Sequence, residues 1–96
     1  MRSYEVMIIL DPEVGDRNVA SLVDNHLKPA IKAGAQITNI DVMGRRRFAY
    51  DIKKRSEGTY VVVNLDAEPA VVKELDRRLS IDDLVLRAKV FRPDAK

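Results

Sequence analysis

The order of apolar patterns along the chain is the feature that most limits its fold. Two stretches, Val19–Ile31 and Val71–Leu79, carry apolar residues at intervals of three and four, the spacing of a helix that buries one face. Stretches rich in Val and Ile lie around them and are typical of strands. One strand precedes the first helix, two separate the helices and one follows the second. The strands are expected at residues 2–10, 35–53, 59–65 and 84–92.

A strand–helix–strand unit that occurs twice predicts an α+β domain with the ferredoxin-like split βαβ fold. Right-handed crossovers then give a four-stranded antiparallel sheet of order 4-1-3-2, with both helices on one face. The first and third strands are central in this order, which suits their apolar runs at residues 6–10 and 61–63. All 96 residues form one domain, with a short C-terminal tail expected from about residue 93.

Turn and cap residues predict where the helices begin and end. Asp16 is expected to cap the first helix and Gly34 to close it, and Pro69 is well placed as the first residue of the second helix. Pro29 lies inside the first helix, where its missing N–H and its ring predict a kink or a slackened last turn.

The second strand contains an irregularity. Gly44 interrupts it, and a glycine inside a strand usually marks a bulge or a bend. Ile37 lies in the opposite phase to the later positions, which is consistent with a register break. The polar residues 54–58 predict a hairpin loop that ends in glycine. The later positions expected to share one phase are Ile40, Val42, Arg46, Phe48, Tyr50 and Ile52.

Residues that enzymes use for catalysis are sparse. The one histidine, His26, lies on or beside the apolar stripe of the first helix, where packing against the sheet or pointing to solvent is the simpler interpretation. Asp82 and Asp83 are interpreted as turn residues at the start of a strand. The four glycines are scattered and no metal-ligand spacing occurs. We therefore expect no enzyme activity, catalytic residue, metal, cofactor or small-molecule substrate.

The composition favours a soluble cytoplasmic domain. The chain has no cysteine, which is compatible with a reducing compartment. Its apolar runs of about five residues fall far short of the roughly twenty needed to cross a bilayer. Glu5 and Asp11 bracket the N-terminal apolar run and no cleavage site follows, so neither a signal peptide nor membrane association is expected.

Positive charge is concentrated in one short segment. The net charge is only +2, but residues 41–55 hold six basic and two acidic side chains, whereas residues 1–40 and 56–96 each carry −1. Cations on an exposed edge strand can simply prevent sheet-to-sheet aggregation. Cations at a hairpin tip can instead reach phosphates. Base stacking on the sheet is weakly supported, because Tyr60 is the one aromatic among the aliphatic residues of the third strand. Recognition of an RNA backbone by rim cations is the better inference, which leaves the open face or the second-strand edge for a protein partner.

The most specific motif is Gly44–Lys53, which resembles the signature of the bacterial S-six family of small-subunit ribosomal proteins. That signature contains, in order, a glycine, two basic or polar residues, an apolar residue, Ala-Tyr, any residue, Ile and a basic or small residue; in this chain three arginines lie between the glycine and the apolar Phe48. The opening Met1–Glu5 is similar to the family's "MRxYE", and the resemblance extends to about Arg92. Phe48 replaces the usual leucine and Asp51 a frequent proline, which affects local packing and stiffness but not the role of the strand.

The resemblance implies a structural, non-enzymatic constituent of the small subunit. It would bind 16S rRNA in the central domain as a heterodimer with the S-eighteen ribosomal protein. The rRNA contacts are then expected at Arg2, Lys53, Lys54, Arg55 and Arg87. The protein-partner contact is expected on the second-strand edge, at Ile40, Val42, Arg46, Arg47 and Phe48.

Two other functions remain open from the sequence. A ferredoxin-like regulatory or self-associating domain would explain the apolar central strands, but it gives no reason for six cations within residues 45–55. A small enzyme of the acylphosphatase type on the same fold requires an arginine in the first loop, and residues 11–15 contain none.

Overall fold

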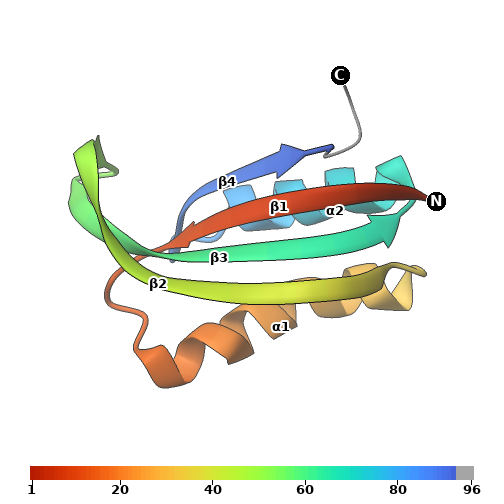
Figure 1. The fold of residues 1–96 in the computed structure, drawn as a ribbon, viewed down its shortest axis with the longest axis horizontal. Helices are drawn as coiled ribbons and strands as arrows, with labels where there is room; N and C mark the ends of the chain where they lie inside the picture. The colour runs from red at the N-terminus through yellow and green to blue at the C-terminus, as the bar shows by residue number, and fades with distance from the viewer. Residues whose placement is uncertain (93–96) are drawn as a thin grey trace.

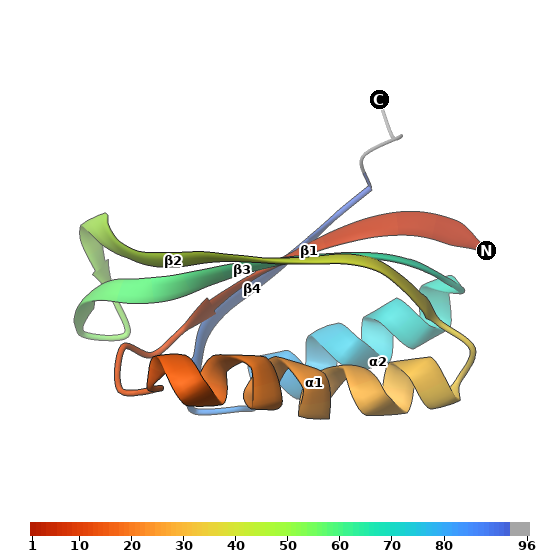
Figure 2. The ribbon, with the colours of Figure 1, turned by 60° about the horizontal axis from the view of Figure 1, so that its bottom comes forward.

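The computed structural model describes residues 1–92 and has the predicted element order β-α-β-β-α-β. The antiparallel sheet has the strand order β2-β3-β1-β4, which is the predicted 4-1-3-2 counted from the other edge. Both helices cover one face of the sheet and leave the other face open (Figures 1 and 2). The expected tail from residue 93 lies outside the described residues. The elements are β1 (Arg2–Leu10), α1 (Asp16–Lys32), β2 (Gln36–Ile52), β3 (Arg55–Ala67), α2 (Pro69–Ser80) and β4 (Val85–Phe91).

The core fills the space between the sheet and the two helices. Alternate residues of the central strands point into it, and Val6, Ile8, Val61 and Val63 are at most 1% exposed. Burial of this amphipathic layer is what stabilises the helices, because each presents one apolar stripe to the sheet. The buried helix residues are Val19, Val23, Leu27, Ala30, Val72, Leu75 and Leu79.

The helix ends follow the sequence closely, with one exception. Because α1 begins at Asp16, the capping residue is Gly15, and the expected cap at Asp16 is wrong; Asp16 instead places its charge in the first turn. Gly34 closes the helix as predicted, with a φ of +106°; its own N–H donates to the Ile31 carbonyl and the N–H of Ala35 donates to the Ala30 carbonyl. The helix continues through Pro29 to its end, and Pro69 begins α2 as predicted.

A bulge at Gly44 confirms the predicted irregularity in β2. Gly44 has a φ of +94°, and the pairing with β3 shifts between Val42 and Gly44. Val42 pairs with core-facing Val61, whereas Gly44 pairs with Tyr60 on the open face. The expectation of one shared phase along β2 is therefore wrong, because the extra residue reverses the alternation. Ile40 and Val42 lie on the helix side, and Arg46 and Phe48 lie on the open side.

The strands β2 and β3 are joined by a two-residue turn, not by the polar loop expected at residues 54–58. Lys53 and Lys54 form the turn, with φ values of 48° and 67°, as in a type I′ hairpin. Gly58 lies inside β3, and a Cβ there would lie 2.8 Å from Ile9 Cγ2 and from the Leu10 carbonyl oxygen. This glycine serves close packing, not chain reversal. The hairpin extends past the end of β1 and twists strongly (Figure 2).

Candidate nucleic-acid interface

The hairpin is held to the rest of the domain by its own cations. Arg55 donates from Nε to Asp11 Oδ2 at 3.1 Å and from Nη2 to Glu13 Oε1 at 3.2 Å. The Asp11 carboxylate is buried and also accepts the Glu13 backbone N–H at 2.9 Å. A buried carboxylate is costly unless it is paired and hydrogen-bonded. Arg55, predicted as an rRNA contact, therefore already has a structural role.

Two more hairpin cations contact backbone carbonyls. Arg45 donates to the carbonyl of Pro12 at 3.0 Å, and its guanidinium lies 3.6 Å from Glu57. Lys53 donates from Nζ to the carbonyl of Val85 at 3.2 Å, at the start of β4. Some cations of the basic segment thus hold the hairpin against the rest of the domain, and the sequence did not reveal this role.

The remaining cations of the segment point into solvent. Arg46, Arg47 and Lys54 are exposed, and none of them forms an ion pair with another part of residues 1–92. The same holds for Arg2 and Arg87. These side chains are free to neutralise phosphates.

The predicted rRNA contacts do not form one patch. Arg87 lies on β4 close to the hairpin, because both line the same groove. Arg2 lies at the other end of β1, opposite Ala67. Leu10, at the end of β1, lies eight positions after Arg2, which corresponds to roughly 26 Å of strand.

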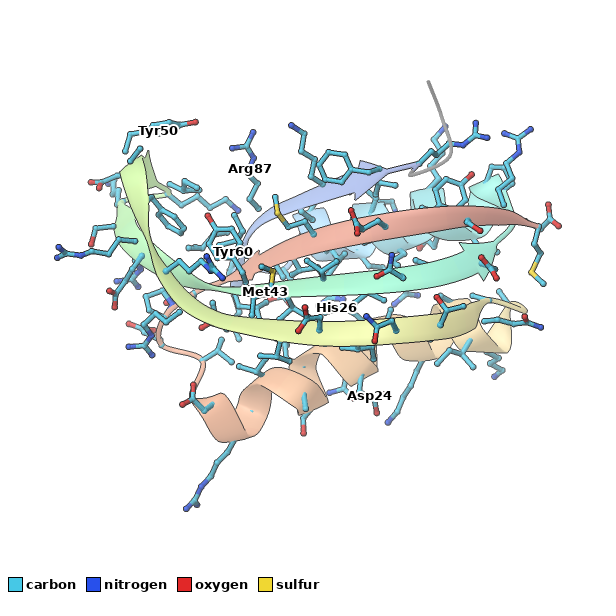
Figure 3. The ribbon with its side chains drawn as sticks, in the orientation of Figure 1. Asp24, His26, Met43, Tyr50, Tyr60 and Arg87 are labelled. Carbon is cyan, nitrogen blue, oxygen red and sulfur yellow. The ribbon has the colours of Figure 1, made fainter. Side chains whose placement is uncertain are left out.

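The groove lies on the open face of the sheet, and we call it the open-face groove. Its floor includes Ile9, which is 2% exposed even though it faces away from the helices. The rings of Phe48 and Tyr60 lie 6.1 Å apart at 57°. Figure 3 shows Tyr50 at the hairpin and Arg87 on β4. The residues that line the groove are Met7, Ile9, Arg47, Phe48, Ala49, Tyr50, Ile52, Tyr60 and Arg87.

The predicted protein-partner residues fall on two surfaces. Ile40 and Val42 are 45% and 49% exposed and line a shallow hollow with Ala20, Val23 and Asp24 of α1. We call this surface the β2–α1 edge. Beyond the bulge, the other members of the set lie on the open side or along the groove: Arg46, Arg47 and Phe48.

His26 has a partner that sequence reasoning missed. Its Nε2 lies 2.6 Å from Oδ2 of Asp82, which ties α1 to the turn before β4. The other carboxylate oxygen of Asp82 accepts the N–H of Leu84 at 2.9 Å, so the interpretation of Asp82 as a turn residue is confirmed. Burial alone raises the pKa of Asp82, but the hydrogen bonds from His26 and Leu84 outweigh it and lower that pKa below its ordinary value. The His26 side chain is 14% exposed, so it does not extend freely into solvent. Its contact with Asp82 could not be expected from a local pattern, because 56 residues separate the two partners in sequence.

Other kinds of site find no support in residues 1–92. Across that range, no three His, Cys, Asp or Glu side chains are grouped so that they could hold a metal ion. Neither helix has the length and apolar character to cross a membrane.

Comparison with known proteins gives a consistent result. Residues 3–92 match the family model described as Ribosomal protein S6. The chain is 54% identical over 94 residues to the small ribosomal subunit protein bS6 of Cutibacterium acnes, covering 98% of both chains. It is 51% identical to bS6 of Streptomyces coelicolor, again over 98% of both. The crystal structure of the 30S ribosomal protein S6 from Thermotoga maritima has a TM-score of 0.83 and 31% identity, covering 95% of this chain and 86% of that one.

Proposed function

The chain belongs to the ribosomal protein S6 family of the small ribosomal subunit, and from this membership we propose that it binds 16S rRNA in the central domain together with the S-eighteen ribosomal protein. The family is one of structural ribosomal proteins, not of enzymes. The observation that supports the proposal most strongly is 54% identity to a bS6 protein over nearly the whole chain. Its place of action would be the ribosome in the cytoplasm.

The unpaired cations support contact with RNA. Arg46, Arg47 and Lys54 project from the hairpin, and Arg87 projects from β4 beside it. Each of these groups can neutralise a phosphate and release a condensed counterion, a term that does not depend on base sequence. Lys53 and Arg55 would act chiefly by fixing the shape of this surface, since their nitrogens already have partners in the fold.

We place the S-eighteen contact at the β2–α1 edge. Ile40 and Val42, which are 45% and 49% exposed, present apolar surface in the same hollow beside α1. Exposed apolar clusters on a small domain often mark protein contacts. β2 is also an edge strand, whose free N–H and C=O groups can pair with a partner. Arg46, Arg47 and Phe48 would join this contact only if the partner wraps around the edge, because they lie beyond the bulge.

The proposal is tested by replacing the host's own protein with a tagged copy of this chain. Small subunits isolated on a sucrose gradient at low salt should carry the tag in about equimolar amount, and washing at high salt should remove it. A tagged chain that stays at the top of the gradient and sediments as a homo-oligomer would contradict the proposal. That outcome would favour the ferredoxin-like regulatory or self-associating domain.

A further inference from the structure

We propose that the open-face groove holds one unstacked RNA base, with a phosphate of the same strand on Arg87. This inference rests on the proposed function, because it specifies which part of an RNA this face would take. The groove is built from three strands and the hairpin, so it exists only in the folded domain.

The sheet register places a cation and an aromatic ring in one row. Ile9 pairs with Arg87 on one side and with Tyr60 on the other, and paired residues share a face. Neighbouring strands are about 4.8 Å apart, so the backbones of Arg87 and Tyr60 are roughly 10 Å apart. A base over Tyr60 would leave its phosphate within reach of the long Arg87 side chain.

The hairpin adds aromatic surface that the sheet alone lacks. Phe48 packs against Tyr60, and Tyr50 lines the groove although 71% of it is exposed. An exposed tyrosine beside two half-buried rings is not needed for the core. Bases stack on such rings with little regard to sequence, since every base has a flat aromatic face.

Charge on the open face is polarised along the strands. Arg47 and Arg87 line the groove, Lys89 and Asp41 share the next row away from the hairpin, and Glu5 lies one row farther. Two acidic residues neighbour the groove-lining residues: Glu57 pairs with Arg47, and the exposed Asp51 follows Tyr50 in the chain. Arginines and aromatic rings that line the same groove complement a nucleotide, which combines a flat base with a phosphate.

The backbone of the floor argues against a peptide. β1 and β3 are each paired on both sides, so they have no free edge to which a peptide strand could add. What the groove offers is rings, methyl groups and guanidinium groups. These groups favour a nucleobase over an extended protein segment.

The test is an NMR titration of the full chain with adenosine monophosphate, ribose 5-phosphate and inorganic phosphate. With three tyrosines and two phenylalanines, the ring signals can be assigned. Adenosine monophosphate should shift the rings of Tyr50, Tyr60 and Phe48, whereas the two ligands without a base should leave the rings in place and affect only Arg87. Equal ring shifts with ribose 5-phosphate, or no ring shifts with adenosine monophosphate, would overturn the inference.

Variants at Tyr50 provide a second readout with single-stranded oligo(A) of six nucleotides. Tyr50→Leu should weaken binding roughly fivefold or more, while Tyr50→Phe, which keeps the ring, should change it less than about twofold. Equal losses in both variants would overturn the inference. So would an acidic peptide that binds the groove more tightly than oligo(A), since that result identifies a protein site.

Failure of this inference is distinguishable from failure of the proposed function. A wild-type chain that enters small subunits but shows no base-dependent ring shifts retains its ribosomal role and lacks the base site. A wild-type chain that never enters small subunits contradicts the proposed function. It then also contradicts the base site, which rests on that function.

Discussion

The guanidinium of Arg55 lies 3.1 Å from the carboxylate of Asp11, which is buried where β1 ends. This ion pair connects the base of the basic hairpin to the loop that leads into α1. It makes a residue that looks like a free RNA ligand in the sequence part of the internal structure. Glu13, on the same loop, contacts the second arm of the guanidinium.

Arg55→Gln should therefore lower the free energy of unfolding by about 1–2 kcal/mol, because Asp11 loses a charged donor. The Arg55 side chain is 41% exposed, which keeps the cost below that of a fully buried pair. Urea denaturation measures the change. The matched control is Lys54→Gln in the exposed turn, which should stay within about 0.5 kcal/mol. Equal effects in the two variants would show that the Asp11 pair is not stabilising.

Gly58→Ala should destabilise the fold by about 1–3 kcal/mol, because the new methyl group would lie 2.8 Å from the Leu10 carbonyl oxygen and 2.9 Å from Phe48. Thermal unfolding measures the change, with Ser56→Ala at an exposed position of the same strand as control. A neutral Gly58→Ala would mean that the hairpin moves away from β1 without cost.

Asp82→Asn should destabilise the protein by about 1 kcal/mol near neutral pH, because a charge-assisted hydrogen bond to His26 is lost. The folded pKa of Asp82 lies below its ordinary value of 3.8, so its contribution is complete well above pH 3.8 and is lost as the pH falls through the folded pKa. The gap between wild type and variant should close in acid, as followed by urea denaturation at several pH values. Asp83→Asn, at the exposed neighbour, is the control, and a gap that stays constant into acid would contradict the assignment.

Removal of free cations should change the salt dependence of RNA binding. Three single variants are compared with the wild type: Lys54→Gln, Arg87→Gln and Arg2→Gln. In each variant, the magnitude of the slope of log K against log salt should fall by about 0.7–0.9 if the replaced residue neutralises a phosphate. Binding to a central-domain fragment of 16S rRNA, with the S-eighteen protein present, is the measurement. Lys73→Gln on the exposed part of α2 is the control. An unchanged slope for one of these variants would show that the replaced residue does not contact an RNA phosphate.

Val42→Asp should weaken association with the S-eighteen protein at least about tenfold, because it places a charge in the exposed apolar part of the β2–α1 edge. Arg46 lies on the open side beyond the bulge, so Arg46→Glu should weaken association with the S-eighteen protein less than Val42→Asp does. Calorimetry with the purified partner measures both. A normal affinity for Val42→Asp together with a lost affinity for Arg46→Glu would move the partner to the open face.

Much of the fold could be read from the chain because its signals are local. The helical stripes end at Gly34 and begin at Pro69, where backbone geometry leaves few alternatives. The glycine inside the strand predicted a bulge at Gly44. It did not predict that the bulge changes which side chains of β2 face the helices and which face the open side. The direction of that effect depends on how β3 pairs, which is a long-range property.

The candidate site was less predictable, because its contacts join residues far apart in sequence. Arg55 and Asp11 are 44 residues apart, and His26 and Asp82 are 56 residues apart. Charge alone cannot say whether a cation faces solvent or an internal carboxylate. The sequence shows six cations in residues 45–55 without showing which of them have partners, and the structure commits three of them to the fold.

The sequence by itself determined the order of elements, the class of fold and the family, because periodicity, turn residues and the Gly44–Lys53 motif are local properties of the chain. Tertiary structure decided which cations are free, which face each β2 residue presents, and that the rings of Phe48 and Tyr60 meet beside Arg87. The physical reason is that free charge and shared faces depend on strand register and on partners brought together only by folding.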